Sequence, residues 1–567
     1  MAESSTSDTA TATTKRICII GAGASGLSSI KTLLESNQQQ QQPKILFDPI
    51  CYEATDDLGG LWRFTQSESS SVYRSTVINT SKEMMAFSDF PIPDDYPPFL
   101  PHHLIIQYFK KYAEHFGLLK YIHFETRVVS VVPEGDGFRV KIRDRNGTES
   151  EELFDGVMVC SGHHSKPNRV QWEGLELFRG RLLHSHYYKE PFCDEFRDRN
   201  VLVIGIGNSG GDIAVELAKN VAKQVYLSTR SGSWIIPRES LFGSPLDHIP
   251  KWLWLLPVGI LSFLMERVLK LFYGDLKGIA KYLEPHHSFL SSHPTINSEL
   301  VGRIRNGTVQ IVPNVVKFME DGHSVQLDNG TILPHIDTVV ECTGYRIEFP
   351  FLNELSGELS LTQSDDNQVK LFKYMFHPGA YKKNLAFIGL IQPLGAIMPI
   401  AELQSRLACR VFRGEVELPS DEQMWKDIEL KQREVSKRYT HSKRHTIQVD
   451  YAPYMDELAE LAMVIPNYFR MLFTDTRFAV KLLHGPSYPC MYRLEDGSKL
   501  VRKEFREEER RMARETIERT SYSVVGEMYQ SNPSDREKRR DGMVSVIVKA
   551  VFLFVVFVLY FVKRWFK

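Results

Sequence analysis

The chain has 567 residues, of which 43% are hydrophobic and 25% are charged. This composition excludes a disordered chain, a collagen and a small disulfide scaffold, and the length allows about three to four domain-sized units or fewer large ones. Lys and Arg number 69 against 70 Asp and Glu, so the net charge is -1. We therefore expect no nucleic-acid partner, because no overall positive field would attract one.

The first 14 residues are rich in Ser, Thr and Ala and contain no apolar segment. This pattern predicts a disordered N-terminus and argues against a signal peptide.

A first nucleotide-binding pattern follows directly. Residues 15–20 form an apolar stretch that predicts a strand, and residues 27–34 predict a helix. Between them stand Gly21, Gly23, Ala24, Ser25 and Gly26. A strand, a glycine-rich turn and a helix are the parts of a dinucleotide-binding unit, in which the helix N-terminus receives the phosphates. The next predicted strand ends in Glu53, whose carboxylate can accept hydrogen bonds from ribose hydroxyls.

A second copy of this pattern begins at residue 201. The strand 201–204 precedes Gly205, Gly207, Asn208, Ser209 and Gly210, and residues 211–219 predict the helix. The following strand, 224–227, ends in Ser228, Thr229 and Arg230 instead of a carboxylate. A cation and two hydroxyls at this position indicate the 2′-phosphate of NADP, with a solvated surface arginine as the alternative for Arg230.

Two further segments, 155–162 and 337–345, share a buried strand followed by a small hydroxyl residue and a glycine. We expect these strands to carry the chain between two nucleotide domains, beside the cofactor, although either alone would also suit an ordinary core strand. The pairs Asn146-Gly147, Asn306-Gly307 and Asn329-Gly330 are typical of hairpin turns.

The C-terminal segment has a different character. Residues 543–562 form a 20-residue apolar run, about 30 Å long as a helix, which matches the hydrocarbon core of a bilayer. We expect a single transmembrane anchor that leaves the catalytic body in the cytosol; a buried core helix is the alternative. Residues 495–542 read as a charged linker before it.

Residues 178–189 carry a motif that identifies a family. Phe178, Gly180, His184, Tyr188 and Lys189 fill the fixed positions of the motif of flavin-containing monooxygenases, and they lie between the two glycine patterns, as in that family. The chain resembles the animal-type members in particular at residues 58–62, 79–84, 387–393 and 450–458. The resemblance covers residues 16–494 and the apolar tail.

The resemblance implies an α/β fold with two Rossmann-like dinucleotide-binding domains, the NADP domain inserted into the FAD domain. The ranges expected are 15–165 and 335–494 for FAD, 166–334 for NADP with a helical insertion, and 543–562 for a transmembrane helix. The family's location implies the endoplasmic reticulum membrane. Its reaction uses FAD, NADPH and O2 and oxygenates an amine nitrogen or a sulfur through a C4a-hydroperoxyflavin.

The resemblance also implies roles for individual residues. Asn79 is the expected catalytic residue, because its amide would lie near the flavin and stabilise the oxygenated intermediate and NADP. Asn208 would contact NADP, and Gln392 would face the flavin ring at a helix N-terminus. His184 would be a structural hydrogen-bonding residue. Further cofactor contacts are expected from Gly60, Leu61 and Trp62.

Other activities remain open at this point. Baeyer–Villiger oxygenation of ketones is one, although the related motif commonly has Trp where this chain has Tyr188. An NADPH oxidase that releases H2O2 needs the same motifs, and a non-catalytic nucleotide sensor would need both sites without the chemistry. The sequence leaves the natural substrate and a homo-oligomeric state undecided.

Overall fold

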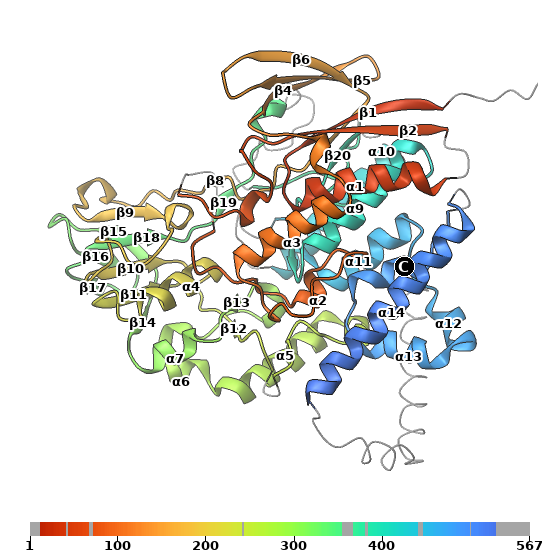
Figure 1. The fold of residues 1–567 in the computed structure, drawn as a ribbon. Coiled ribbons are helices and arrows are strands. Elements are labelled where there is room, and N and C mark those ends of the chain that lie inside the picture. The colour runs from red at the N-terminus through yellow and green to blue at the C-terminus, as the bar shows by residue number, and fades with distance from the viewer. Residues whose placement is uncertain are drawn as a thin grey trace, which may run out of the picture.

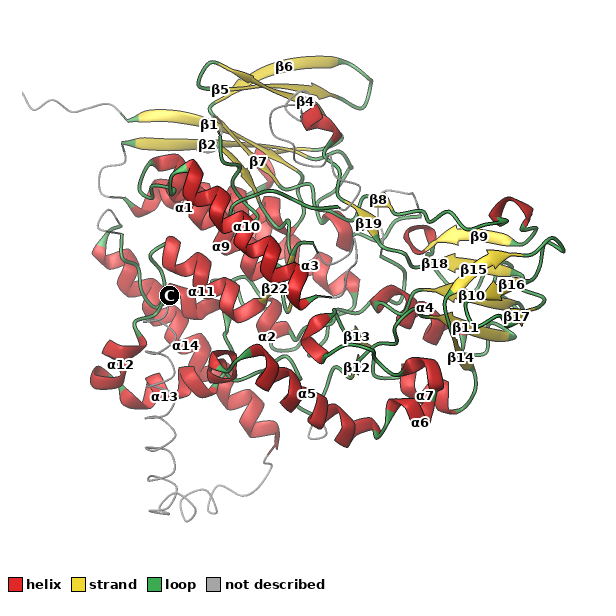
Figure 2. Ribbon diagram, turned by 180° about the vertical axis from the view of Figure 1, so that it is seen from behind, coloured by secondary structure: helices red, strands yellow, loops and turns green. Residues whose placement is uncertain are grey.

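The computed structural model describes residues 12–40, 44–66, 72–240, 243–353, 367–379, 384–439, 446–498 and 501–528. Two five-stranded parallel sheets lie side by side, and helices from the C-terminal part of the chain cover the first of them (Figure 1). The view from behind shows a separate antiparallel sheet above the first parallel sheet (Figure 2).

The first sheet has the strand order β20-β7-β1-β2-β3. Its strands are β1 (Thr13–Ile20), β2 (Ile45–Tyr52), β3 (Ile122–His123), β7 (Gly156–Val159) and β20 (Leu385–Phe387). All neighbours pair in parallel. Such a sheet buries both faces, which explains the uninterrupted apolar run in β7. The strand β1 starts at Thr13, two residues earlier than predicted, and residues 1–11 of the predicted disordered segment lie outside the described residues.

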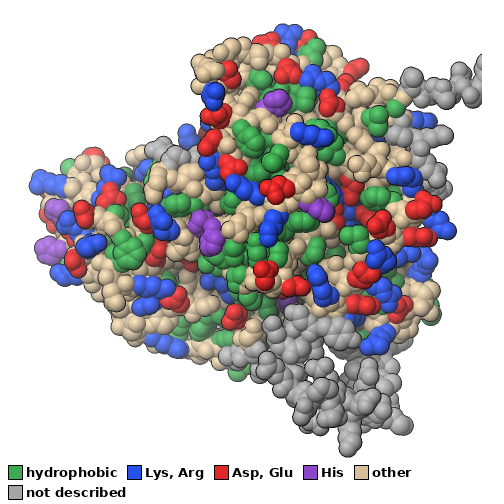
Figure 3. Space-filling view, in the orientation of Figure 1, with side chains coloured by type: hydrophobic (Ala, Val, Ile, Leu, Met, Phe, Trp, Pro, Cys, Tyr) green, Lys and Arg blue, Asp and Glu red, His purple; other side chains and the backbone are tan. Residues whose placement is uncertain are grey.

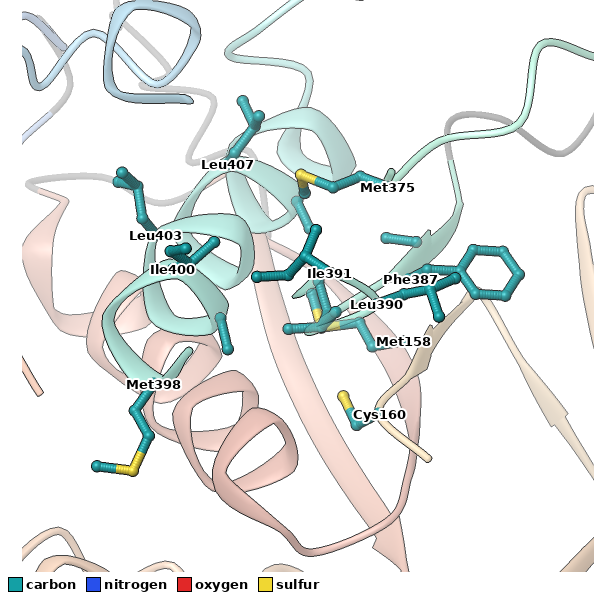
Figure 4. Close-up of a cluster of buried hydrophobic side chains, with 14 of the residues drawn as sticks. Met158, Cys160, Met375, Phe387, Leu390, Ile391, Met398, Ile400, Leu403 and Leu407 are labelled. Carbon is teal, nitrogen blue, oxygen red and sulfur yellow. The ribbon is translucent and has the colours of Figure 1, made fainter. Parts of the chain in front are cut away.

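Two helices in contact cover one face of this sheet. They are α1 (Ala24–Gln39) and α9 (Met398–Arg413). Figure 4 shows Met158 of β7 and Phe387 of β20 near Leu390 and Ile391, with Leu403 and Leu407 projecting from α9; all of them belong to one apolar core. The helix α1 ends at Gln39, later than the predicted residue 34, because Gln is a good helix former and extends the last turns.

The second sheet has the order β14-β11-β10-β18-β9 and is also parallel. Its strands are β9 (Arg181–His184), β10 (Asn200–Ile204), β11 (Gln224–Ser228), β14 (Val309–Val312) and β18 (Thr338–Glu341). The helix α4 (Asn208–Leu217) follows β10, and α7 (Leu300–Arg305) precedes β14. Because β18 pairs with β10, the second sheet extends past residue 334, where the sequence placed the end of this domain.

A helical insertion separates β11 from β14. It contains the paired strands β12 (Ile235–Ile236) and β13 (Thr295–Ile296), a 3-10 turn at Lys251–Leu255, and the helices α5 (Val258–Tyr273) and α6 (Leu276–Ile279). Only three residues of α5 are buried, Leu261, Ser262 and Leu269, so this helix lies at the surface.

The remaining strands of the described chain form four smaller sheets. They are β4 (Arg127–Glu134), β5 (Gly137–Arg143) and β6 (Glu149–Phe154); β15 (Val315–Phe318), β16 (Val325–Leu327) and β17 (Ile332–Leu333); β8 (Lys166–Pro167) with β19 (Tyr345–Arg346); and β21 (Gln392–Leu394) with β22 (Gln448–Asp450). Hairpins at Asn146-Gly147 and Asn329-Gly330 are confirmed. The hairpin predicted at Asn306-Gly307 is wrong, because Asn306 is the C-cap of α7. Gly307 has a positive φ there, and both a hairpin turn and a helix end favour a glycine with positive φ.

The remaining helices are α2 (Lys82–Met85), α3 (His102–His115), α10 (Asp421–Arg438), α11 (Tyr451–Leu461), α12 (Tyr468–Thr474), α13 (Thr476–His484) and α14 (Lys503–Met528). The helix α14 falls inside the predicted charged linker 495–542, and it packs on the body through Ala513 and Ile517, both buried.

The fold class expected from the sequence is wrong in one part, the transmembrane helix. None of the helices within the described residues is long and apolar enough to cross a membrane. The helix α14 has the length, but it is rich in Glu and Arg, and each such charge is costly at a bilayer centre. The predicted anchor at 543–562 lies outside the described residues. The expected fold class therefore stands without a transmembrane helix, and the location at the endoplasmic reticulum stays a prediction.

Candidate functional site

The first glycine turn connects β1, the central strand of the first sheet, to α1. Gly21 has a φ of +101°, and its N–H donates to the Tyr52 carbonyl at 2.9 Å. A Cβ on Gly26 would lie 1.9 Å from the Gly21 carbonyl oxygen, so only glycine allows helix and strand to approach this closely. Among the described residues no side chain caps α1, which leaves its first N–H groups for a bound anion.

Glu53 lies beside this turn and is buried. Its Oε2 accepts from the Ala22 N–H at 2.8 Å, and its Oε1 accepts from the N–H and the hydroxyl of Thr55 at 2.9 and 2.7 Å. A carboxylate offers about four acceptor positions, so about one position remains for a ribose hydroxyl.

The predicted contact residues after Leu58 pack across the same turn. The Gly59 N–H donates to the Ala22 carbonyl at 3.0 Å, and a Cβ on Gly60 would lie 3.2 Å from the Gly23 Cα. The short 3-10 turn Gly60–Trp62 follows, with Leu61 exposed and Trp62 half-buried. From the other side, a Cβ on Gly389 would lie 2.3 Å from the Ser25 hydroxyl oxygen. The structure thus brings Gly59 and Gly60, which precede Leu61 and Trp62, against the turn that carries Ala22 and Gly23 and leads to Ala24 and Ser25.

The second glycine turn repeats this geometry between β10 and α4. Gly205 has a φ of +109° and donates to the Ser228 carbonyl at 3.0 Å, while a Cβ on Gly210 would lie 1.8 Å from the Gly205 carbonyl oxygen. The Asn208 Oδ1 accepts from the Ile296 N–H at 2.9 Å, and the neighbouring Ser209 is exposed. The turn is therefore braced by β13 of the insertion.

The two segments expected beside the cofactors lie next to these turns. A Cβ on Gly21 would come within 2.9 Å of the Cys160 carbonyl, and a Cβ on Gly205 within 2.6 Å of the Cys342 carbonyl. Cys160 follows β7 and Cys342 follows β18, each the neighbour of a turn-bearing strand.

The three residues after β11 differ in what they can offer a phosphate. The Ser228 hydroxyl donates to the Pro313 carbonyl at 2.9 Å, and Thr229 is buried. Arg230 is exposed, and no hydrogen bond or ion pair joins it to the rest of the described chain. Arg230 is therefore the group in this trio that is available to an anion.

Asn79, the expected catalytic residue, lies in the segment before α2 and is half-buried. Its Oδ1 accepts from the Arg238 guanidinium at 2.9 Å, and the same guanidinium donates to the Ile78 carbonyl at 3.2 Å. Sequence reasoning missed Arg238, because 159 residues separate it from Asn79 and no local pattern marks it.

Gln392 follows the last strand of the first sheet, as expected, but it begins β21 instead of a helix. Its N–H donates to the Ile447 carbonyl at 2.8 Å, and α9 begins only at Met398. Its expected position at a helix N-terminus is therefore wrong, since β21 must first pair with β22.

Residues of the family motif lie at the interface between the two sheets' domains. His184 ends β9, and its Nδ1 accepts from the His186 N–H at 3.1 Å; burial lowers the pKa of His184 to about 4, so the ring is neutral at pH 7. The Tyr188 hydroxyl donates to Glu216 of α4 at 2.7 Å. Tyr73 donates to Asp212, one turn earlier on α4, at 2.6 Å, and burial raises the pKa of both carboxyls.

A second group of contacts that sequence reasoning missed is centred on Ser81, two residues after Asn79. Ser81 contacts Asp247 and His248, which come from the insertion. Their distance in sequence again leaves no local signal.

A cavity of about 440 Å³ lies in the insertion, between β12 and α5. Trp234, Leu269, Tyr273 and Pro285 are among its lining residues, and none of the predicted site residues lines it. On the face shown in Figure 3, acidic and basic side chains are interspersed.

The residues around both turns fit dinucleotides. Each turn combines glycines that a Cβ would disrupt with an uncapped helix N-terminus among the described residues. The first adds a buried carboxylate with acceptor capacity for a ribose, and the second adds an exposed arginine. This difference in donor sets suits FAD at the first turn and a 2′-phosphorylated nucleotide at the second.

Comparison with known proteins gives concordant results. A family model described as flavin-binding monooxygenase-like matches residues 14–558. Flavin-containing monooxygenase 5 of Rattus norvegicus is 43% identical over 501 residues, covering 86% of this chain and 90% of that protein. The N-oxide-forming dimethylaniline monooxygenase 2 of Oryctolagus cuniculus is 40% identical, covering 85% and 88%.

Two solved structures share the fold. The S-allyl-L-cysteine S-oxygenase of Allium sativum superposes with a TM-score of 0.60 at 24% identity, covering 89% of this chain and 99% of that one. Cyclohexanone monooxygenase with bound epsilon-caprolactone gives 0.56 at 15% identity, covering 79% and 98%.

Proposed function

Because this chain belongs to the flavin-binding monooxygenase-like family and is a flavin-containing monooxygenase, we propose that it uses NADPH and O2 to oxygenate soft nucleophiles. One oxygen atom goes to an amine nitrogen or a thioether sulfur, and the other leaves as water with two electrons from NADPH. The observation that carries the proposal is the pair of glycine turns with different donor sets, with the Asn79 segment in contact with the insertion of the second domain.

The chain's own residues bind and orient the reactants. The N-terminus of α1 and the Glu53 carboxylate would hold FAD, and the N-terminus of α4 with Arg230 would hold NADPH. When bound, the flavin supplies the activation of O2 and the protein supplies orientation and exclusion of water. The Asn79 amide would donate a hydrogen bond toward the reacting oxygen, since the Arg238 guanidinium occupies its carbonyl oxygen and leaves its NH2 group available.

The names of the relatives support oxygen transfer to nitrogen and to sulfur. One relative is described as N-oxide-forming, and one solved structure is an S-oxygenase. The chemistry is shared, because a tertiary amine and a thioether both present a lone pair to an electrophilic oxygen.

The test uses the full chain loaded with FAD. We incubate it with NADPH, O2 and, separately, a tertiary amine, a thioether and a methyl ketone, and identify the products by mass spectrometry while H2O2 is measured in parallel. The proposal expects an N-oxide or a sulfoxide, 16 mass units heavier than its substrate. An ester from the ketone alone would make the protein a Baeyer–Villiger enzyme, and H2O2 equal to the NADPH consumed in every case would make it an oxidase.

A further inference from the structure

A buried polar cluster joins the insertion to the segment that follows Asn79. Asp247 Oδ2 accepts from the Ser81 backbone N–H at 2.7 Å and from the Ser81 hydroxyl at 3.0 Å. The Ser81 Oγ lies 3.0 Å from His248 Nε2, and Ser81 stands at the start of α2. Ser81 is two residues from Asn79, so whatever holds Ser81 also limits the positions that Asn79 can adopt.

The protons in this cluster can be assigned. Burial lowers the pKa of His248 to about 4, so its ring is neutral at pH 7. The Ser81 hydroxyl has one proton to donate, and it donates this hydrogen bond to the Asp247 carboxylate, which is the stronger acceptor; His248 Nε2–H therefore donates to Ser81 Oγ. The Asp247 carboxylate accepts hydrogen bonds from Ser81 and not from His248. In a hydrolytic Ser-His-Asp triad the carboxylate accepts from the histidine, so this cluster is not such a triad.

The insertion holds the Asn79 segment at two points. Arg238 binds Ile78 and Asn79, and Asp247 binds Ser81. The two holding residues are themselves brought together, because the Leu246 N–H donates to the Arg238 carbonyl at 3.0 Å. Arg238 and Asp247 together therefore act as a clamp on this segment, and the Asp247 carboxyl is the part of it that can titrate.

Asp247 is the end that can titrate. Burial raises the pKa of its carboxyl to about 6, with Glu83 adding to the rise and the two Ser81 hydrogen bonds opposing it. Within the described chain its Oδ1 has no hydrogen-bond partner, so a proton would be added there and Oδ2 would keep both bonds as a weaker, neutral acceptor.

The other titratable groups facing Asp247 are His248 beside it, Glu83 of α2, Tyr451 of α11 and Tyr488 before the 3-10 turn at Pro489–Arg493. Burial raises the pKa of both tyrosines above the ordinary value, and His248 is already neutral at pH 7. Tyr451, Tyr488 and His248 therefore keep the same charge between about pH 5 and about pH 8.

We propose that Asp247 is a positioning residue for Asn79, and that its ionised carboxylate keeps the segment 79–83 in the geometry that directs oxygen to the substrate. The inference rests on the proposed function for the role of Asn79. Protonation of Asp247 loosens this segment, and a larger share of the NADPH electrons then ends in H2O2. Asp247 contacts no substrate in this role and acts through Ser81.

The first test needs no cofactor. Hydrogen–deuterium exchange of the flavin-free chain gives the protection factor of the Ser81 amide, whose N–H donates to Asp247, corrected for intrinsic exchange. We expect protection to fall by about fivefold from about pH 8 to about pH 5, because a charged acceptor binds more strongly than a neutral one. Asp247→Asn, an isosteric mimic of the protonated form, should give the low value at every pH.

The second test uses the FAD-loaded enzyme with NADPH and a thioether. The ratio of H2O2 to NADPH should rise several-fold over the same pH decrease in the wild type and stay high and flat in Asp247→Asn. The matched control is Asp144→Asn, because Asp144 also accepts two backbone N–H bonds, from Asn146 and Thr148, but at the β5–β6 turn. It should behave as the wild type.

Ser81 protection that is constant with pH in the wild type would overturn the inference, and so would an Asp247→Asn profile that still follows pH. The wild-type profile decides the matter even if Asp247→Asn fails to fold. If Ser81 protection changes as expected but no amine or thioether is oxygenated, the proposed function fails and the pH-dependent clamp stands.

Discussion

At the scale of single residues, Gly26 and Gly210 carry the closest contacts of the two nucleotide turns. A methyl group on either would overlap a backbone carbonyl oxygen, at 1.9 and 1.8 Å. A backbone atom cannot move aside as a flexible side chain can, so the helix N-terminus itself would shift away from the phosphates.

Gly26→Ala and Gly210→Ala should therefore fail in different ways. We expect Gly26→Ala to be purified without bound flavin, and Gly210→Ala to keep the flavin but lose most of its affinity for NADPH. Visible absorption measures the first effect and NADP titration the second. The control is Gly302→Ala in α7, where a Cβ meets no atom beyond its own helix within 4 Å. This variant should raise the free energy of unfolding by up to about 1 kcal/mol. Flavin retained in Gly26→Ala would show that the first turn is misassigned.

Arg230 is the second prediction at this scale. Arg230→Ala should raise the KM for NADPH about tenfold or more and leave that for NADH unchanged, because only NADPH carries the phosphate that a charge-assisted bond would hold. Steady-state kinetics with both nucleotides measure the preference. Lys223→Ala, at the opposite end of β11, should change neither KM; an unchanged preference in Arg230→Ala would place the 2′-phosphate elsewhere.

At the scale of elements, a buried arginine holds three helices and the segment after α2 together. Arg493 is 5% exposed and forms ion pairs with carboxylates of α1, α9, α14 and the segment after α2. These partners are Glu35 at 3.3 Å, Glu402 at 2.8 Å, Asp89 at 3.1 Å, and Glu509. The charged segment after residue 494 thus includes a helix that packs on the core. The high charge of this segment alone predicted a linker and gave no indication of the helix.

Arg493→Ala would remove the ion pairs of Glu402 and Glu509 with Arg493, while Lys31 would still pair with Glu35 and Asp89. We expect a loss of about 3–5 kcal/mol in the free energy of unfolding, which urea titration measures. Arg511→Ala is the matched control on α14, since its pair with Glu515 is 62% exposed on both sides and should contribute less than about 1 kcal/mol. A similar small loss in both variants would contradict a structural role for Arg493.

At the scale of the whole molecule, two tyrosines join the nucleotide domains. Tyr73, from the chain that leads to Asn79, and Tyr188, from the family motif, contact each other with ring centroids 5.7 Å apart and donate to Asp212 and Glu216 on α4. Because α4 also follows the second glycine turn, this contact would relate the position of a nucleotide bound at that turn to that of Asn79.

Tyr188→Phe should therefore affect both stability and NADP binding. Removing the hydroxyl leaves the half-buried Glu216 carboxylate short of one donor, at a cost of about 1 kcal/mol in the free energy of unfolding, and a looser α4 should weaken NADP binding. Urea titration and calorimetric NADP titration measure the two effects. Tyr121→Phe, a half-buried ring that donates to no carboxylate in the described chain, should change neither.

Local patterns predicted the parts of the site that depend on neighbours in sequence. The glycine turns, Glu53 and the strands beside them follow from the requirement that a strand, a turn and a helix pass close to a phosphate, and the structure places them as expected. Predictions failed where the same local sequence pattern occurs in two different kinds of local structure. Asn306-Gly307 suits a hairpin or a helix end, and Gln392 follows a strand that leads into another strand.

The amino-acid sequence by itself determined two nucleotide-binding units, their order and the family to which they belong, because these depend on short-range backbone geometry. Only the tertiary structure decided what holds Asn79. Arg238, Asp247 and the Tyr188–Glu216 contact join positions that the chain separates by 159, 166 and 28 residues. Long-range contacts of this kind arise from packing, which leaves no periodic signal in either segment. The tertiary structure also turned part of a charged linker into the docked helix α14, and the net charge of -1 gave no sign of it.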